Sequence, residues 1–408
     1  MNILLCNHYA GSHRHGMEYR PYYLAREWVR LGHHVTIVAA SRSHVRQQNP
    51  DCRAGLTEEW IDGVRYVWLP TPAYEGNGAR RVVNIFSFVG QLLRFRSRVT
   101  GDWRPDAVIA SSTYPLDIVP TSRIARRYDA KLLFEVHDLW PLTPIELGHM
   151  SRWHPFIMAL QWAEDFAYRR ADCVVSMLPK AASYMQDRGL RSNKFVHIPN
   201  GVDVQEWKAL NQPLSEEHRD AIRRHQERGR FLIGYAGAHG VANALEVLVD
   251  AATHLRDSPA AFLLVGQGPE KTHLQQRARA AGLPNIEFLP PIPKQAVPAF
   301  LRAMDALYIG LVRQPLFRFG VSPNKLFDYM MAGRPVIHAI DTPGDLVAES
   351  GCGLSCAAED PLAVAATVRE LIERPTAELA AMGERGRQFV LRHHAYEGLA
   401  RHFLEVMT

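Results

Sequence analysis

The chain has 408 residues, of which 47% are hydrophobic and 22% charged, and its formal net charge is +5. A single hydrophobic core stops growing at about 250 to 300 residues, so we expect two domains, and the composition excludes a disordered or fibrous chain. The many arginines suit an anionic partner, but no basic reading helix, zinc-ligand spacing or aromatic RNA-binding motif is present, which argues against nucleic acid.

The cysteines and the hydropathy pattern predict the compartment. The five cysteines are widely spread and include no C-x-x-C pair, which favours a reducing compartment and argues against a structural metal. The opening residues MNILLC read as a strand rather than as an export signal, and no run approaches the roughly 18 apolar residues of a spanning helix. We therefore expect a cytoplasmic protein.

The first residues predict a βαβ unit. Residues 2–16 read as a buried strand followed by a polar, glycine-containing loop, residues 17–30 carry apolar side chains at helical spacing, and residues 31–40 return as a strand. Later apolar segments continue the alternation and read DAVIAS, KLLFEVHD, CVVSML and KFVHIPN. Such an alternation indicates a parallel sheet with right-handed crossovers.

The second half repeats this organisation after a charged connection at about residues 205–230. A new alternation of strands and helices begins with FLIGYAG and runs to a tail with a helical pattern. We therefore expect an α/β fold with two Rossmann-like, doubly wound parallel-sheet domains, at 1–205 and 206–385. A final helix at 386–408 is expected to pack back on the first domain and brace the two lobes.

The segment SPNKLFDYMM predicts a helix whose N-terminus binds an anion. Ser322 suits the N-cap and Pro323 the first helical position, which leaves the amides of Asn324 and Lys325 pointing out of the helix end. Asp328 lies one turn after Lys325 on the same face, so phosphates could bind the amides and the lysine while ribose hydroxyls bind the carboxylate. An ordinary capped helix with a surface ion pair remains the alternative.

Six segments, in order and over nearly the whole chain, resemble the retaining glycosyltransferases of family 4, which have the GT-B fold. They read LAREWVRLGHHVTIVA, LLFEVHDLWP, HIPNGVD, IGYAG, FLLVGQGP and SPNKLFDYMMAGRPVI. The resemblance implies two domains that face a cleft, the first binding the acceptor and the second a nucleotide sugar. It is strongest to a WbuB-like subgroup that adds amino- or deoxy-sugars during bacterial O-antigen and surface-polysaccharide synthesis.

The resemblance also implies roles for the helix at SPNKLFDYMM. Asp328 takes the place of the second glutamate of the family's E-x7-E element, which holds the ribose, and Lys325 with its neighbouring amides would hold the diphosphate and assist catalysis. The donor site would include Ser322, Asn324 and Leu326. The expected reaction moves an N-acetylated or deoxy hexose from a UDP-linked donor to a polyprenyl-diphosphate-linked saccharide, with retention.

Two departures from the family pattern bear on the donor site. The first glutamate of E-x7-E falls at Gly320, and the usual Arg and Lys after the first strand of the second domain are replaced by a stretch that offers Gly237 and His239. Gly266 and Gly268 are expected to let a loop pass close to the nucleotide. The chain contains no Asp-x-Asp motif, so we expect no metal and no other cofactor.

His137 matches the position at which many family members place a histidine near the donor sugar. We predict that it is catalytic, with the neighbouring Asp138 on the acceptor side, and that Glu135 orients its neighbours. A strand-end histidine satisfied by its neighbour is the alternative. No pair of carboxylates suggests a glycosidase, and a mechanism in which the leaving phosphate takes the acceptor proton fits better.

The loop at 8–20 is the predicted acceptor site. It lies at the carboxyl end of the first strand and contains two glycines for close approach and four cationic side chains for a diphosphate: Gly11, Gly16, His13, Arg14, His15 and Arg20. A solvated basic loop is the alternative.

Residues 79–99 combine an apolar centre with arginines at both ends. This pattern fits a helix on the anionic inner membrane, which would place the enzyme peripherally at that surface beside a lipid-linked acceptor. A core helix of the first domain fits equally well.

Two other functions remain open. A nucleotide-sugar 2-epimerase would use the same two domains without an acceptor, and a non-catalytic sugar-nucleotide-binding subunit would explain the departures from the family pattern.

Overall fold

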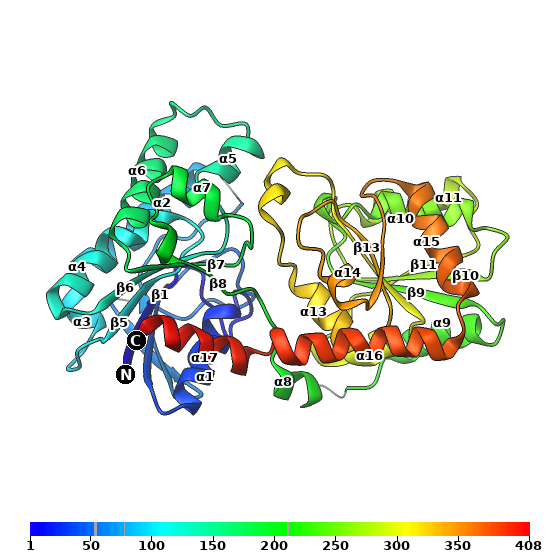
Figure 1. Ribbon diagram of the computed structural model, residues 1–408, viewed down its shortest axis with the longest axis horizontal. Helices are drawn as coiled ribbons and strands as arrows, with labels where there is room; N and C mark the ends of the chain where they lie inside the picture. The colour runs from blue at the N-terminus through cyan, green and yellow to red at the C-terminus, as the bar shows by residue number, and fades with distance from the viewer. Residues whose placement is uncertain (53–54, 77, 210–211) are drawn as a thin grey trace. The chain divides into compact units, whose positions relative to one another are not determined.

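The computed structural model describes residues 1–52, 55–76, 78–209 and 212–408. The chain forms two compact units, Met1–Asn200 with Tyr396–Thr408, and Gly201–Ala395, each built around its own sheet (Figure 1). Sequence analysis predicted the first domain boundary after residue 205 and the start of the returning helix at 386. In the structure the first boundary lies after Asn200. The chain re-enters the first unit only at Tyr396.

The first unit contains an eight-stranded sheet in the order β3-β4-β2-β1-β5-β6-β7-β8. All neighbours are parallel except the β3–β4 hairpin, which is antiparallel. The central strands are largely buried and mostly apolar, as expected for a parallel sheet with helices on both faces, although β6 also buries Glu135. The strands are β1 (Asn2–Cys6), β2 (His34–Ala40), β3 (Thr57–Ile61), β4 (Val64–Leu69), β5 (Ala107–Ala110), β6 (Lys131–Val136), β7 (Cys173–Ser176) and β8 (Phe195–His197).

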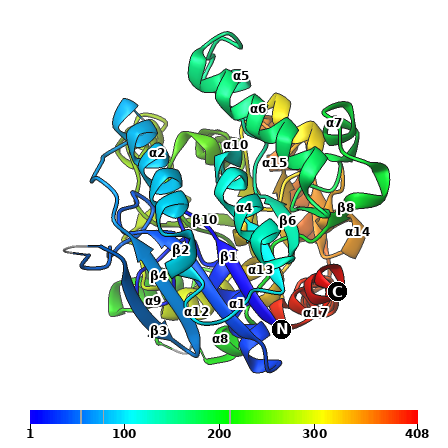
Figure 2. The ribbon, with the colours of Figure 1, turned by 90° about the vertical axis from the view of Figure 1, so that its left-hand side faces the viewer.

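Helices lie on both sides of this sheet. Helix α17 packs beside α1: the indole of Trp28 donates a hydrogen bond to the Ala400 carbonyl at 3.0 Å, and its ring centroid lies 5.3 Å from that of Phe403. Helices α2, α4 and α6 lie on the opposite side of the sheet from α1 and α17 (Figures 1 and 2). The helices are α1 (Arg20–Arg30), α2 (Ala79–Arg94), α3 (Arg96–Val99), α4 (Ile118–Tyr128), α5 (Leu142–Glu146), α6 (Pro155–Arg170), α7 (Ala182–Asp187) and α17 (Tyr396–Met407), with 3-10 turns η1 (Pro115–Asp117) and η2 (Ser192–Lys194).

The stretch at 79–99 packs partly into the core of the first unit. Helix α2 buries Ile85, Phe88 and Leu92, whereas Val83 and Phe86 are exposed. The helix is therefore amphipathic, with one face in the core and some apolar side chains on the outer face. Within the described residues, no helix is both long enough and apolar enough to cross a bilayer.

The second unit contains a six-stranded parallel sheet in the order β11-β10-β9-β12-β13-β14. The strands are β9 (Phe231–Ala236), β10 (Ala260–Val265), β11 (Ile286–Leu289), β12 (Ala306–Gly310), β13 (Val336–Ala339) and β14 (Gly353–Ser355). The helices are α8 (Val204–Ala209), α9 (Glu216–Gln226), α10 (Leu245–His254), α11 (Lys271–Ala280), α12 (Val297–Arg302), α13 (Asn324–Met331), α14 (Leu346–Ser350), α15 (Pro361–Glu373) and α16 (Thr376–His393), with 3-10 turns η3 (Val241–Asn243), η4 (Lys294–Ala296) and η5 (Pro315–Phe319).

Helix α13 begins one residue later than the predicted N-cap at Ser322 implies. Pro323 occupies the N-cap position in an extended conformation, and its own side chain makes no capping hydrogen bond. The residue before a proline is disfavoured in helical conformation, but proline itself can also stand outside the first turn. The predicted helix is thus present, and its predicted cap is corrected.

Candidate functional site

A pocket of about 430 Å³ in the second unit lies at the carboxyl ends of β9 and β10, beside the first turn of α13. The pocket contains four residues that the sequence assigned to a donor site: Gly237, Gly266, Lys325 and Asp328. The remaining lining residues are Ala236, Ala238, Val265, Gln267, Pro291, Ile292, Val297 and Tyr329. Carboxyl ends of parallel strands are where α/β sheets bind ligands, and helix N-termini favour anions.

Lys325 has two neutral partners in this pocket. Its Nζ donates hydrogen bonds to the hydroxyl of Tyr235 at 2.9 Å and to Oδ1 of Asn243 at 2.8 Å. Because burial removes water without supplying a counter-charge, the pKa of Lys325 falls to about 8. A bound anion would favour the charged ammonium group and is therefore the ligand for which this lysine is suited.

Asp328 lines the same pocket without pairing with Lys325. Burial raises the pKa of Asp328 to about 6, although the charge of Lys294 and a hydrogen bond from the side chain of Trp207 oppose that rise. In the described part of the chain, Asp328 and Lys325 form no ion pair, so the alternative of a surface pair on α13 is not what the structure contains. The carboxylate is left to accept hydrogen bonds in the pocket.

Two glycines let the loops after β9 and β10 touch. A Cβ on Gly266 would lie 1.9 Å from the carbonyl oxygen of Gly237, and a Cβ on Gly268 would lie 2.3 Å from that of His239. Real Cβ atoms do not approach backbone so closely, so a side chain at either position would push the loops apart. This close approach is between the two loops, and the predicted approach of Gly266 and Gly268 to a nucleotide stays a prediction.

His239 lies behind the pocket rather than in its lining. The ring is fully buried, and neither ring nitrogen has a hydrogen-bond partner among the described residues. Burial, followed by the charges of Lys271 and Lys325, lowers the pKa of His239 to about 4. The imidazole is therefore neutral near pH 7 and does not supply the cation that the family places in this region.

The other predicted donor residues lie outside the pocket lining. Leu326 is buried in the core, Asn324 is exposed and Ser322 is partly exposed. Lys271 donates hydrogen bonds from Nζ to the carbonyls of Gly266 and Leu289, both at 2.8 Å. It ties the ends of β10 and β11 together.

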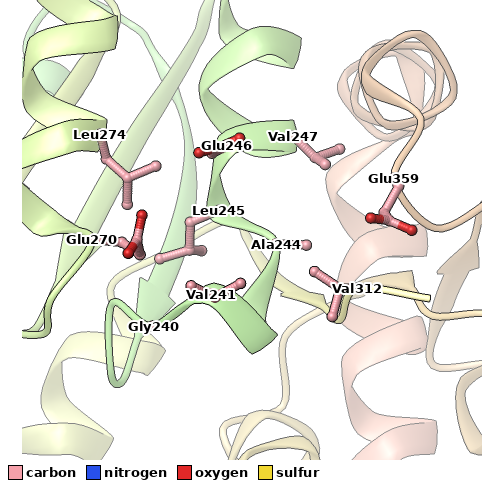
Figure 3. A pocket seen from close by; sticks show the side chains of 10 residues that line it. All are labelled: Gly240, Val241, Ala244, Leu245, Glu246, Val247, Glu270, Leu274, Val312 and Glu359. Atoms are coloured by element: carbon pink, nitrogen blue, oxygen red, sulfur yellow. The ribbon is translucent and has the colours of Figure 1, made fainter. Parts of the chain in front are cut away.

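A second pocket, of about 160 Å³, lies at the start of α10 (Figure 3). Figure 3 shows Leu245 and Val241 between the carboxylates of Glu270 and Glu359. Glu246, Glu270 and His273 are the one group in the described residues whose ligand atoms could together hold a metal ion. These carboxylates would repel a diphosphate, so the larger pocket with Lys325 is the better candidate for one.

In the first unit, His137 belongs to a buried hydrogen-bond network at the ends of β5 and β6. Its Nε2 lies 3.0 Å from Oγ of Ser111 and 3.2 Å from Oε2 of Glu135. Ser111 itself donates to Glu135 at 2.6 Å. The predicted partner Asp138 instead accepts from the Leu139 amide and the hydroxyl of Thr143. Sequence analysis did not predict a role for Ser111, which directly follows the last residue of β5. Glu135 and His137 are two residues apart, so the alternation of side chains along a strand places them on the same face.

Glu135 remains ionised in this network. Burial raises its pKa, but the charges of Arg20 and His137 outweigh that effect and bring the pKa of Glu135 to about 2. Arg20 is 1% exposed, donates to Glu135 at 2.9 Å, and also donates to the carbonyls of Ile198 and Pro199. The prediction that Arg20 meets an acceptor is corrected: a buried guanidinium with these partners positions Glu135 and the end of β8.

The loop at 8–20 is neutralised by carboxylates of the β3–β4 hairpin. His13 Nδ1 lies 3.4 Å from Asp62, and Arg14 Nη1 and His15 Nε2 each lie 3.4 Å from Glu59. A Cβ on Gly11 would lie 1.9 Å from the carbonyl oxygen of Gly16, so Gly11 serves the close fold of the loop itself. The structure therefore does not present these three basic residues as an open anion site.

Two α/β units, each with a mainly parallel sheet and the second with a pocket at its strand ends, have the architecture of the GT-B class. Residues 15–201 match the family described as glycosyl transferase 4-like domain, and residues 230–374 match glycosyl transferases group 1. The chain belongs to this family of GT-B glycosyltransferases.

One curated relative is similar in sequence over most of the chain, and solved structures share the fold over nearly all of it. The putative colanic acid biosynthesis glycosyl transferase WcaI of Escherichia coli is 24% identical over 323 residues, which cover 75% of each chain. Sucrose-phosphate synthase from Thermosynechococcus elongatus superimposes with a TM-score of 0.70 at 16% identity, over 99% of this chain and 98% of that one. Anabaena HepE, solved in complex with UDP, gives a TM-score of 0.67 at 15% identity over 99% of both chains.

Proposed function

We propose that the chain is a retaining, metal-independent family 4 glycosyltransferase. It transfers an N-acetylated or deoxy hexose from a UDP-linked donor to a polyprenyl-diphosphate-linked saccharide in bacterial surface-polysaccharide synthesis. Two similar proteins support this proposal. WcaI is named for colanic acid biosynthesis, and HepE was solved in complex with UDP. The proposed site of action is the cytoplasmic surface of the inner membrane, where such an acceptor is held.

The observation that carries the proposal is the pairing of Lys325 with two neutral groups in the pocket at the ends of β9 and β10. A desolvated ammonium group without a counter-ion favours a ligand that brings negative charge. The diphosphate of a nucleotide sugar brings that charge, and the charge grows on the leaving phosphate as the glycosidic bond breaks. Lys325 would thus bind the donor and stabilise the transition state.

Asp328 and the glycine loops complete the proposed donor site. Asp328 accepts the ribose hydroxyls, while Gly237 and Gly266 allow the nucleotide to lie against the backbone. Lys325 and Asp328 are separated by about one helical turn, so both side chains project from the same face of α13. A nucleoside diphosphate offers its phosphates and its ribose at a matching separation of a few ångströms.

The proposed chemistry exchanges one bond to the anomeric carbon for another. The bond from that carbon to the leaving phosphate oxygen breaks, the acceptor hydroxyl oxygen bonds to the same face of the carbon, and its proton passes to the phosphate. His137 contacts the donor sugar, and Glu135 holds the imidazole through Nε2. That hydrogen bond directs Nδ1 away from Glu135 and leaves it to act on the substrate.

A calorimetric titration of the purified chain with UDP, GDP and TDP, with and without magnesium, tests the proposal. We expect micromolar binding of UDP that magnesium does not change. Failure of all three nucleotides to bind would contradict it. Turnover is then followed by mass spectrometry with a panel of UDP-sugars and a lipid-linked saccharide extract, in which isomerisation without transfer would identify an epimerase instead.

A further inference from the structure

Six of the nine large apolar side chains that are exposed among the described residues of the first unit lie on α2, on α6 or in the segment between α5 and α6. Trp153 is 81% exposed and Trp162 is 54% exposed. Exposed aromatic side chains of this size, gathered in one region, typically mark an interaction surface. The six are Val83, Phe86, Leu147, Trp153, Met158 and Trp162, whereas Met17, Val45 and Trp60 are exposed elsewhere in the first unit.

On α6 these side chains form a continuous outer stripe. Met158, Trp162, Phe166 and Arg170 follow one another at intervals of four residues, so they share one helix face. The rings of Trp162 and Phe166 stack with centroids 5.6 Å apart. The helix buries other residues against the sheet, among them Leu160, so the stripe is additional to its core face.

Helix α2 contacts α6 near the start of α6 and carries exposed apolar side chains of its own. Phe86 of α2 and Phe156 of α6 are in ring contact, with centroids 6.3 Å apart. Val83 and Phe86 lie one turn apart and are both exposed, while the core face of α2 points into the unit. Figure 2 shows α2, α4 and α6 on the same side of the sheet.

A pocket of about 400 Å³ between α4 and α6 adds positive charge to this surface. Arg123, Arg126 and Arg170 line it together with Trp162 and Phe166. Among the described residues, none of the three arginines forms an ion pair. The carboxylate that also lines the pocket, Asp172, accepts a hydrogen bond from the Leu132 amide at 2.8 Å.

The surrounding helices carry almost no compensating charge. The sequences of α2 and α4 contain no Asp or Glu, and together they contain six arginines: Arg80, Arg81, Arg94, Arg123, Arg126 and Arg127. Of the two acidic residues on α6, Glu164 is buried and Asp165 pairs with Arg188 at 2.7 Å. The outer surface of the three helices is therefore both apolar and cationic.

We propose that this surface, defined by Phe86, Trp162, Arg123, Arg126 and Arg170 and called the docking face below, binds an anionic phospholipid bilayer. The arginine pocket takes the phosphates of lipid headgroups, because guanidinium groups match phosphate oxygens in pairs. The tryptophan and phenylalanine side chains enter the headgroup boundary, where amphipathic aromatic rings are favoured. The inference extends the proposed function, whose acceptor is held in the membrane.

Vesicle cosedimentation of the full chain tests the docking face. Vesicles of phosphatidylcholine alone are compared with vesicles that also contain phosphatidylglycerol, at low and high salt. The test variant is Arg123→Glu with Arg126→Glu and Arg170→Glu. The matched control reverses three exposed arginines of the second unit, Arg219, Arg279 and Arg392, and so changes the net charge equally.

We expect the wild-type chain and the control to bind the anionic vesicles and the test variant to bind about a hundredfold more weakly, since each of the three arginines at an anionic surface contributes about fivefold. Equal binding by the test variant and the control would overturn the proposal, as would equal binding of the wild type to neutral vesicles. If the test variant binds vesicles normally but loses affinity for inorganic pyrophosphate, the pocket serves a soluble anion and the proposal is also overturned.

A second readout reports on insertion rather than charge. Brominated lipids should quench part of the tryptophan fluorescence of the wild type, and Trp153→Phe with Trp162→Phe should remove that part. Unchanged quenching in the double variant would contradict the docking face. UDP titration of the same samples keeps the two proposals separate. Absence of UDP binding with intact vesicle binding contradicts the donor site alone. Normal UDP binding without vesicle binding contradicts the docking face alone.

Discussion

The ammonium group of Lys325 lies over the ring of Tyr235, with Nζ 4.5 Å from the ring centroid and 2.9 Å from the phenolic oxygen. The aromatic face attracts the cation without neutralising it, so the positive charge stays available to a ligand. Burial by these neighbours also makes the charge sensitive to pH, since the pKa of Lys325 falls to about 8.

UDP affinity should therefore decrease as the pH rises through about 8. A phosphate ligand favours the charged lysine, so binding is strongest below the pKa of Lys325 and is lost as the ammonium group deprotonates. Lys325→Arg should keep binding and remove this pH dependence, because a guanidinium stays charged. Calorimetry between pH 6.5 and 9.5, roughly 1.5 units on either side of that pKa, is the measurement; an unchanged pH profile in the arginine variant would contradict the assignment.

Lys325 should also make the free energy of unfolding depend on pH, in the opposite direction to its effect on UDP affinity. Between the folded pKa of about 8 and the unfolded value of about 10.4, the unfolded chain holds a proton that the folded chain has released. Stability of the ligand-free protein should thus rise with pH across this window. Denaturant titrations of the wild type and Lys325→Met, which removes the ionisable group, should differ in slope only there.

Asp328 should discriminate UDP from 2′-deoxy-UDP. If its carboxylate accepts the ribose hydroxyls, the wild type binds UDP more tightly by about tenfold, the value of one good hydrogen bond to a charged group. Asp328→Ala should lower UDP affinity to that of the deoxynucleotide and leave the deoxynucleotide nearly unaffected. Equal losses for both ligands would mean that Asp328 supports the pocket without touching the ribose.

Ser111→Ala should lower turnover with little change in KM or in stability. The hydroxyl bonds both His137 and Glu135, so its loss loosens the imidazole without leaving a buried charge unpaired. We expect kcat to fall about tenfold. Glu135→Gln is a poorer test, because it leaves the guanidinium of Arg20 buried without its partner and should cost about 3 to 5 kcal/mol. Thr143→Val, which removes a hydrogen bond to Asp138, is the matched control.

Gly266→Ala should abolish UDP binding while Gly240→Ala should not. A methyl group on Gly266 would meet the carbonyl of Gly237 at 1.9 Å, whereas one on Gly240 would meet nothing within 4 Å. Both positions lie in the loops that surround the donor pocket, so the pair separates close packing from general loop disturbance. Circular dichroism should give the same signal for both variants, and normal UDP binding by Gly266→Ala would contradict the predicted loop contact.

The sequence predicts the repeated strand and helix alternation because each strand is a short apolar run and each helix has a regular apolar spacing. It also predicts that Gly237, Gly266 and Lys325 converge, since loops that follow parallel strands meet at one edge of the sheet. The structure brings these residues into one pocket. Their chemical roles stay predictions.

Contacts between distant segments could not be predicted in this way. The cations at 13–15 are neutralised by Glu59 and Asp62 of a hairpin more than 40 residues further along the chain, and local charge patterns say nothing of such pairs. Likewise, the sequence suggests that Arg20 is available to an anion, whereas in the structure its side chain is buried and pairs with Glu135. Alternation along a strand does place Glu135 and His137 on one face, so that pair was within reach of the sequence.

The most direct test of the account compares UDP with uridine on the wild type and on Lys325→Gln. If Lys325 holds the diphosphate, the variant should bind UDP about a hundredfold more weakly and should bind uridine as the wild type does. Equal UDP affinity in the two proteins, or equal losses for UDP and uridine, would contradict the central claim that this lysine is the phosphate-binding group of the donor site.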